Sequence, residues 1–585
     1  MRKIVSCLVV AALIFSGPLQ FVSAKEVVWE TTLEDKMSWS QVTYFGTLLV
    51  GSKTSLSSYN PENGGLMWRR EDFNKIAPFD VREMSGLPVI IINQDQGLGG
   101  SKTKLSAVSL VDGKILWETD TMAGNSLGAY SVPSHKLAIL FRNVFTEAED
   151  NGLYIFAYDV ESGELKWKTL YQKKPNVIQT HLADNVGMFY VRNDFSGHHE
   201  PVVDGDHLYA PFAGVHCFDL LTGNLKWEVS FKTAHKTLKK AYAPILIEEG
   251  IVYATGEGVV YAIDQESGRL KWKSPKVPSG LIAQLIVAED MVLARLGGNF
   301  YNQGAKAFKL DKPLGVVAFN KQTGKMLWEF KGAKESITNL VYLPGQNTVM
   351  FADANSLIGI DAKSAGQVKE TFKLPLEFKR NIGVSDVAST SVKTLTGGIG
   401  GLVRAGAKMA IGKDRKDPPV AVTKQPNGSL VVRGRQHLLA FDPSKQEILW
   451  STYYAAPGSS GFEMAIMTTL TALSVLQTQF SSMTGYSSSY NAGKSIERSF
   501  QSMDKFLDRR FSKTQNTERY SYILTRVSDG EDAGIGIMAI DMETGEPGEQ
   551  IVFDEKDPEY KVDDMSQRVY HFKGKKNIVA YDLGQ

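Results

Sequence analysis

Histidines and acidic residues gather in one stretch of the sequence, where they could form a metal site. Imidazole and carboxylate groups are common metal ligands, and a zinc site needs three or four of them to converge. Five of the nine histidines lie here with three acidic residues: His181, His198, His199, His207, His216, Glu200, Asp204 and Asp206. Their spacing matches no zinc pattern, so we assign no metal ligand and expect exposed polar loops.

Cysteine chemistry is limited by the two cysteines, Cys7 and Cys217, which are too few for a disulfide-stapled scaffold or a four-cysteine zinc site. Cys217 lies in an apolar run just before Asp219, where a thiol is expected to be buried and inert. The sequence contains no H-E-x-x-H pair and no phosphate-binding G-x-x-x-x-G-K-[ST] loop. We therefore assign no catalytic residue and no cofactor-binding residue.

Residues 1–24 of the 585 carry the pattern of a secretory signal peptide. Two basic residues precede an apolar run at 4–15, which is too short to span a membrane, and a small-residue cleavage site follows at 22–24. Without the two basic residues, the net charge changes from +1 to −1, which excludes a chain-wide footprint for nucleic acid. We expect an exported protein, periplasmic or secreted, whose mature chain is 25–585.

A repeat runs through the mature chain. Each copy has alternating apolar residues, then Asp, Asn or Ser, then Gly four positions later and Trp after another four. Five copies are plain: 105–118, 155–168, 215–228, 260–273 and 316–329. The alternation predicts a half-buried strand, and the Asp-x-x-Ser/Thr-Gly run predicts a tight turn in which Gly adopts a positive φ. A second strand follows, so each copy is a hairpin with one large aromatic residue at a fixed place.

Weaker copies extend the repeat and close it into a ring. The Asp-type residues of ten units stand at positions 60, 109, 159, 219, 264, 320, 361, 442, 541 and 582. Spacings of about 40–50 residues are typical of four-stranded propeller blades. We predict an all-β, multi-bladed β-propeller of ten units by count, although eight blades is the commoner closure, so the units around Asp361 and Asp541 are expected to be irregular. Residues 26–29 and 578–584 look like two halves of one unit and should close the ring.

The signature A-[FYI]-D-x-x-[ST]-G-x-x-x-W resembles the pyrroloquinoline-quinone-type β-propeller repeat over nearly the whole mature chain. In that family the Trp packs between adjacent blades and docks on the turn of a neighbouring repeat. The resemblance implies this structural role for every tryptophan except Trp39: Trp29, Trp68, Trp117, Trp167, Trp227, Trp272, Trp328 and Trp450.

The family divides by function. One branch, the quinoprotein alcohol and glucose dehydrogenases, holds a quinone and Ca²⁺ in the ring centre, and its alcohol dehydrogenases carry adjacent cysteines that form a disulfide over the cofactor. The mature chain has Cys217 alone and no C-x-x-C-H haem site. The other branch consists of non-catalytic scaffolds such as the lipoprotein B subunit of the outer-membrane protein assembly machinery, whose lipid-modified cysteine this chain lacks. The resemblance implies the non-catalytic branch, without a cofactor.

Two long gaps between repeats mark insertions. Residues 385–417 are Gly-rich and predict a loop that ends in a charged, solvated run at 413–417. Residues 455–518 have apolar residues at helical spacing and predict a helical insertion, either a helical pair packed on the ring or a hairpin for a partner or membrane surface. Both insertions lie between the last strand of one repeat and the first strand of the next, so they should emerge on the same face of the ring.

These observations favour an exported, non-catalytic β-propeller that acts as a binding or assembly scaffold. Its partner would be a protein or a cell-envelope component, contacted through the insertion face. Two alternatives stay open: a quinone- or metal-dependent oxidoreductase that uses the ring centre, and a carbohydrate- or peptide-binding sensor that uses the axial funnel. A fold of this kind does not decide function by itself.

Overall fold

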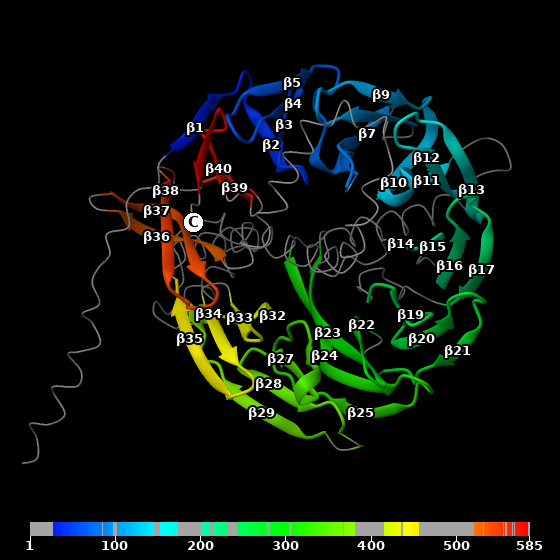
Figure 1. Cartoon of the computed structure of the whole chain (residues 1–585), viewed down its shortest axis with the longest axis vertical. Helices are drawn as coiled ribbons and strands as arrows, with labels where there is room; N and C mark the ends of the chain where they lie inside the picture. The colour runs from blue at the N-terminus through cyan, green and yellow to red at the C-terminus, as the bar shows by residue number, and fades with distance from the viewer. Residues whose placement is uncertain are drawn as a thin grey trace, which may run out of the picture.

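The strands form a closed ring of blades around a central axis, and the chain runs once around it (Figure 1). The computed structural model describes residues 27–582 with gaps of up to three residues and seven longer gaps: 97–101, 145–151, 174–200, 232–242, 303–306, 381–414 and 455–519. The predicted signal peptide at 1–24 therefore lies outside the described residues.

Blades 1 to 5 each have four antiparallel strands, which follow one another from the centre to the circumference. Blade 1 contains β2 (Met37–Val42), β3 (Leu48–Ser52), β4 (Leu56–Tyr59) and β5 (Leu66–Arg70); blade 2, β6 (Val81–Glu83), β7 (Val89–Gln96), β8 (Lys102–Ser109) and β9 (Ile115–Glu118); blade 3, β10 (Met122–Val132), β11 (Leu137–Val144), β12 (Gly152–Asp159) and β13 (Leu165–Lys173); blade 4, β14 (Val202–Asp204), β15 (His207–Ala210), β16 (Gly214–Asp219) and β17 (Leu225–Ser230); blade 5, β18 (Leu246–Glu248), β19 (Ile251–Gly256), β20 (Val259–Asp264) and β21 (Leu270–Lys273). A short pairing between β10 and β8 joins blades 2 and 3 into one sheet.

Blades 6 to 10 repeat the pattern with one shorter blade and one composite blade. Blade 6 contains β22 (Ile282–Ala288), β23 (Met291–Asn302), β24 (Ala307–Asn320) and β25 (Met326–Phe330); blade 7, β26 (Val341–Leu343), β27 (Thr348–Ala352), β28 (Ser356–Asp361) and β29 (Glu370–Pro375); blade 8, β32 (Ala421–Lys424), β33 (Leu430–Arg433), β34 (His437–Asp442) and β35 (Glu447–Tyr453); blade 9, β36 (Tyr520–Asp529), β37 (Asp532–Asp541) and β38 (Pro547–Phe553); blade 10, β39 (Tyr560–Asp563), β40 (Arg568–Lys573), β41 (Asn577–Asp582) and β1 (Val27–Thr32). The pair β30 (Lys379–Arg380) and β31 (Arg415–Lys416) lies between blades 7 and 8.

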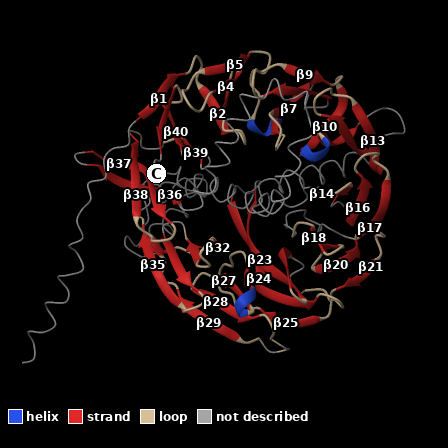
Figure 2. Cartoon of the chain, viewed as in Figure 1, coloured by secondary structure: helices blue, strands red, loops and turns tan. Residues whose placement is uncertain are grey.

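Helix is almost absent from the described residues, which contain three short 3₁₀ helices (Figure 2): η1 (Pro78–Asp80), η3 (Pro133–His135) and η4 (Pro344–Gln346). None of the described helices is long and apolar enough to cross a membrane. The predicted helical insertion at 455–518 and most of the Gly-rich insertion at 385–417 fall outside the described residues.

Position within a blade explains the sequence pattern of each strand. Middle strands such as β3 are buried at every residue because blades cover both faces of them. Outer strands such as β17 have one cover only, so Trp227 is buried while Leu225, Lys226 and Glu228 are exposed. The repeat signature therefore corresponds to a buried strand, a turn and an outer strand with one buried face.

Apolar cores lie between blades, and they run without a break around the ring. Ten clusters of buried residues each join one blade to the next, from blades 1 and 2 to blades 10 and 1. The closing cluster packs Trp29 and Tyr570 of blade 10 against Leu48 and Val50 of blade 1. Strand β1 pairs with β41 in antiparallel register, as the split repeat predicted.

Eight tryptophans fasten neighbouring blades, as the family resemblance implied. Each indole Nε1–H donates to a backbone carbonyl in the turn of the next blade, at 2.7–3.0 Å: Trp29 to Pro61, Trp68 to Leu110, Trp117 to Val160, Trp167 to Leu220, Trp227 to Gln265, Trp272 to Lys321, Trp328 to Ala362 and Trp450 to Glu543. Trp39 instead lies on the inner strand β2 of blade 1.

Ten blades close the ring, so the count of ten units is confirmed and the commoner eight-blade closure is wrong for this chain. Irregularity was expected around Asp361, but blade 7 has all four strands, because its turn is only one residue longer and places Gly366 five positions after Asp361. For the unit of Asp541, irregularity stays a prediction. Its blade 9 shows three strands, and the residues just before Tyr520 lie outside the described part.

Candidate functional site

Turns on one face of the ring hold their aspartates by local hydrogen bonds. Asp264 Oδ1 accepts hydrogen bonds from the backbone N–H of Ser267 at 3.0 Å and from its hydroxyl at 2.7 Å, and Lys271 Nζ lies 3.2 Å from Oδ2. The hydrogen bond from the Ser267 hydroxyl is the main reason that the pKa of Asp264 falls to about 2. The same turn geometry recurs at Asp159 and Asp219. These carboxylates stabilise the turns that carry them.

The histidines of the sequence cluster do not converge. His207 Nε2 lies 2.5 Å from Lys226 Nζ, whereas the buried His216 pairs with Glu228 at 3.3 Å and has its pKa lowered by burial. The two acidic residues described here have separate partners: Asp204 with Gln265, and Asp206 with His135. His181, His198, His199 and Glu200 lie outside the described residues. Among the residues that the structure describes, no group of three or more His, Cys, Asp or Glu could hold a metal ion.

Cys217 is buried, which confirms the prediction from its place in an apolar strand. It belongs to the core between blades 4 and 5, with Tyr209 and Trp227. Burial raises the pKa of its thiol to about 12, so the group is a neutral thiol at physiological pH. A thiolate nucleophile at this position would need an environment that the core does not provide.

A G-x-S-x-G spacing, which was not among the candidate motifs above, occurs at residues 124–128. In a nucleophile elbow, the serine stands on a sharp turn between a strand and a helix. Here the five residues lie inside β10, which pairs with β11 from Gly124 opposite Val144 onward. The spacing is therefore part of a propeller strand and not an elbow.

One polar pair that sequence reasoning missed lies at the start of blade 8. His437 Nδ1 is 3.0 Å from Oδ2 of Asp417, which is fully buried, while the His437 side chain is 12% exposed. The imidazole stacks on Phe378 with ring centroids 4.7 Å apart, and it packs against Tyr453 at 4.8 Å. A buried carboxylate and two aromatic rings thus fix the orientation of one histidine.

Burial of Asp417 corrects the expectation that the run at 413–417 is wholly solvated. Strand β31 pairs with β30 and turns the chain back toward the ring, where Asp417 N–H donates to the Phe378 carbonyl at 3.0 Å. Gly434 makes room, because a Cβ on it would lie 2.6 Å from Asp417 Oδ2. The charged run at 413–417 gave no sign that Asp417 is buried. Asp417 and His437 stand 20 positions apart, a spacing that matches no catalytic motif.

The Asp417–His437 pair has the arrangement of a histidine held for proton transfer. Donation from Nδ1–H to the carboxylate leaves the lone pair on Nε2, which has no hydrogen-bond partner in the part of the chain that the structure describes. An imidazole held in one tautomer by a buried carboxylate can act as a general base toward water or a hydroxyl.

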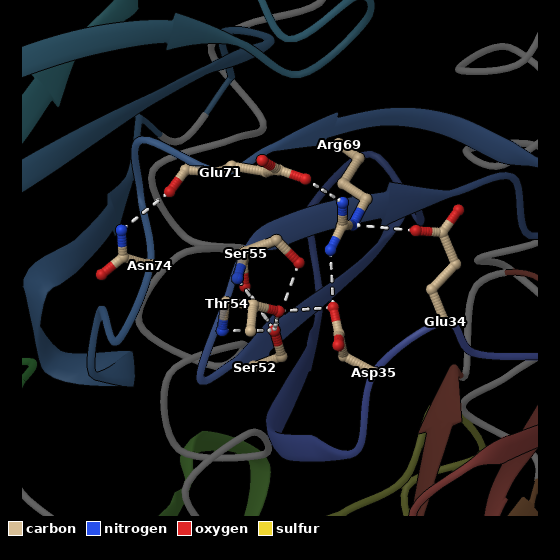
Figure 3. A network of polar contacts seen from close by, with 8 residues as sticks. All are labelled: Glu34, Asp35, Ser52, Thr54, Ser55, Arg69, Glu71 and Asn74. Carbon is tan, nitrogen blue, oxygen red and sulfur yellow. Dashed lines mark hydrogen bonds and ion pairs between the residues drawn. The ribbon is translucent and has the colours of Figure 1, made fainter.

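A network of polar contacts surrounds Arg69 on the outer strand of blade 1 (Figure 3). Its guanidinium contacts three carboxylates: Glu34 at 3.2 Å, Asp35 at 2.6 Å and Glu71 at 2.5 Å. Hydrogen bonds from Thr54 and then from Arg69 lower the pKa of Asp35. Because Glu34 and Asp35 lie between β1 and β2, this network fastens the passage from blade 10 to blade 1, which is a structural role.

Comparison with known proteins places these features in a family. The family model described as "Outer membrane protein assembly factor BamB" matches residues 21–227, 98–292, 154–348 and 211–452, which together cover more than half of the chain. Tetrathionate hydrolase of Acidithiobacillus ferrooxidans is 30% identical over 138 residues, which are 21% of this chain and 27% of that protein. The chain therefore aligns with about a quarter of the length of this relative.

Comparison with solved structures finds natural and designed proteins, each at a TM-score below 0.5. BamB from Moraxella catarrhalis is 17% identical, with 72% of this chain and 97% of that chain covered at a TM-score of 0.33. The computationally designed Ika8 protein is 12% identical, with 70% and 96% covered at a TM-score of 0.32. The dihydro-haem d1 dehydrogenase NirN in complex with DHE is 10% identical, with 61% and 72% covered at a TM-score of 0.33.

Proposed function

The chain belongs to the β-propeller family described as outer membrane protein assembly factor BamB, and from this membership we propose that it is an exported, non-catalytic scaffold that binds a protein or cell-envelope partner. The observation that carries the proposal is the match of the family model along four overlapping stretches of the repeat. The continuous cores between ten blades support it, because such a ring presents surfaces in fixed relative positions.

The partner surface in this proposal is the face that bears the two insertions. Outer strands β29 and β35 end, and inner strands β32 and β36 begin, on the side of the ring opposite to the Asp turns, because neighbouring strands alternate in direction. In the sequence, the ranges 385–417 and 455–518 fall between these strand ends, so the proposal puts both insertions on that side. Export fits this role, since a partner in the cell envelope is reached only after translocation.

Affinity capture tests the scaffold proposal. A tagged mature chain and a variant that lacks 455–518 are expressed in the organism that encodes the protein, and partners are compared after mild cross-linking of the envelope fraction. We expect a defined partner with the intact chain and its loss from the deletion variant, with equal thermal melting of the two proteins. Identical partners for both would contradict the insertion face, and no partner for the intact chain would contradict the scaffold.

A hydrolytic activity is the second candidate, favoured by the Asp417–His437 pair. The tetrathionate hydrolase relative gives a substrate to try, although the alignment reaches only 27% of that protein. In this candidate, His437 Nε2 accepts a proton from water, and buried Asp417 stabilises the imidazolium that forms.

Turnover of tetrathionate by the purified mature chain tests this second candidate. We expect a rate that falls by about 10²–10⁴-fold in His437→Gln, the usual contribution of general base catalysis. His207→Gln is the matched control, since His207 pairs with a lysine rather than with a buried carboxylate. Equal rates in the two variants, or no turnover by the wild-type chain, would refute the candidate.

A further inference from the structure

Strands β30 and β31 form a separate two-stranded ladder that consists of basic residues only. Lys379 lies opposite Lys416 at what we call the lysine level, and Arg380 lies opposite Arg415 at the arginine level. Like charges directly opposite each other destabilise a strand pair, and so short a pair has little else to hold it together. In the other strand pairs that the structure describes, no Lys or Arg lies opposite another Lys or Arg. The fold therefore concentrates positive charge here against its own repulsion.

The ladder leads directly into the Asp417–His437 pair. One position beyond the lysine level, Phe378 lies opposite Asp417, whose backbone N–H donates to the Phe378 carbonyl at 3.0 Å. Both residues contact His437: Oδ2 of Asp417 lies 3.0 Å from Nδ1, and the Phe378 ring stacks on the imidazole with centroids 4.7 Å apart. His437 therefore marks one face of the ladder.

Strand alternation places the arginine level on that same face. Successive residues of a strand lie on opposite faces, whereas residues two positions apart share a face. The arginine level is two positions from Phe378 and Asp417, so it lies on the face that His437 marks, about 7 Å further along the ladder. The lysine level, one position away, lies on the other face. Two arginines and one histidine thus share a face.

We propose that the arginine level and His437 form a binding site for a small, multivalent oxoanion with sulfonate or phosphate groups. Each guanidinium offers two parallel N–H donors, which match two oxygens of such a group. A bound anion would offset the repulsion between the two arginines, so the ligand would also stabilise the ladder. On the same face, His437 Nε2 would accept a proton from water beside the anion.

This inference deepens the hydrolytic candidate, on which it rests for the role of the anion as a substrate. Tetrathionate, the compound in the name of the relative, has a negatively charged sulfonate group at each end, so it belongs to the class of ligand that the arginine level favours. Binding can be measured without turnover. The site and the hydrolytic activity can therefore fail separately.

Calorimetric titration of the purified mature chain with sodium tetrathionate tests the site, with sodium chloride at equal ionic strength as the control for screening. The double variant Arg380→Gln, Arg415→Gln removes the arginine level. The matched control, Lys379→Gln with Lys416→Gln, removes the same charge from the other face. We expect saturable binding that weakens about 10²-fold in the arginine variant, which loses two charge-assisted contacts, and about twofold in the lysine variant, which loses only more distant charge.

The other outcomes separate the site from its alternatives. Equal weakening in the two double variants would show diffuse attraction and overturn the site. It would also be overturned by no saturable binding, or by binding only to phosphatidylglycerol-containing vesicles and not to free tetrathionate. Arginine-dependent binding without turnover would support the site and refute the hydrolytic candidate.

Folding of the variants is checked by thermal melting. Both double variants reduce like-charge repulsion, so neither should melt below the wild-type chain. If the arginine variant melts lower, Arg380→Lys with Arg415→Lys takes its place, because it keeps the charge and removes the planar donors. It should weaken tetrathionate binding about tenfold, and unchanged binding would overturn the site.

Discussion

Eight of the ten blade junctions carry the Trp fastening, and two do not. At the junction of blades 7 and 8, Phe372 takes the place of Trp and packs against Phe441 in a tilted arrangement, with ring centroids 4.6 Å apart. At the junction of blades 9 and 10, Glu549 stands at the Trp position of β38. These two junctions flank blades 8 and 9, so this pair is joined to the other eight blades without a tryptophan on either side.

The turn that receives the side chain changes together with the Trp. Where an indole docks, the fifth residue of the turn is glycine in almost every case, and an added Cβ on Gly223 would lie 2.4 Å from the Trp167 ring. Where Phe372 replaces Trp, the facing turn of blade 8 has Gln446 at φ 58°. The facing turn of blade 10 is the place where β41 and β1 meet as separate segments.

This difference teaches that Trp and Gly form one unit of the repeat. A positive φ alone does not require glycine, because Gln446 adopts it. The indole that lies against the turn is the stronger requirement, and where it is absent a side chain is tolerated at the cost of backbone strain alone.

Gly223→Ala should have the largest effect on this comparison. The added Cβ would overlap the Trp167 ring, and the alanine would have to keep the backbone φ of 71°. We therefore expect a loss of about 3 kcal/mol in the free energy of unfolding, measured by urea denaturation. Gly428→Ala is the control, because φ is 87° there with no atom within 4 Å of the added Cβ, and it should cost about 1 kcal/mol. Equal losses in the two variants would mean that the positive φ, and not contact with the indole, explains why glycine occupies this position.

Trp167→Phe should have the next largest effect on the free energy of unfolding. It removes the hydrogen bond to the buried Leu220 carbonyl, which is 2.8 Å long, and leaves that oxygen without a donor, so we expect a loss of about 2 kcal/mol. Trp450→Phe should cost less in the same assay, because its bond to Glu543 is exposed and water can replace it. A larger loss for Trp450 would contradict this reading of the fastening.

A double-mutant cycle at Phe372 and Gln446 should show a smaller, favourable coupling. Phe372→Trp alone should destabilise the junction because the indole meets the Gln446 side chain. In the double variant with Gln446→Gly, the new indole can lie against a glycine as in the other blades. We therefore expect the double variant to be more stable, by about 1 kcal/mol in the free energy of unfolding, than the sum of the two single effects predicts. Additive effects in urea denaturation would show that the junction of blades 7 and 8 differs by more than these two residues.

Asp264→Asn should have the smallest effect, and only in acid. The pKa of Asp264 is depressed to about 2, so its stabilisation is present above the unfolded value of 3.8 and is lost as the pH falls toward 2. The melting temperatures of wild type and variant should therefore converge between pH 4 and pH 2. Asn320→Asp, in the matching turn of blade 6, should introduce the same acid dependence, and a flat profile for it would refute the assignment.

Most of the fold could be predicted from the sequence because the residue types of the repeat determine its local structure. Asp159 predicts a turn, Gly163 a positive φ and Trp167 a buried aromatic residue. The number of times this set recurs gives the number of blades. The preference for eight blades failed because it came from other propellers, whereas the spacing of this chain gave ten.

The Asp417–His437 pair could not be predicted, because tertiary packing creates it. No local pattern links two residues that meet only after β31 returns beside Phe378. The histidines that are close in the sequence do not form one site, since His207 and His216 have separate partners in the ring.

Closure of the ring by β1 and β41 has a consequence in time. Asn577 on β41 contacts Glu30 on β1 across 547 residues of sequence. At about 5–20 residues per second, a ribosome needs roughly 30–110 seconds to make the chain between them. Throughout that interval, Trp29 has no sheet to join and the first blade has one uncovered side. The ring therefore cannot close until the whole chain has been made, because β41 is the strand that pairs with β1.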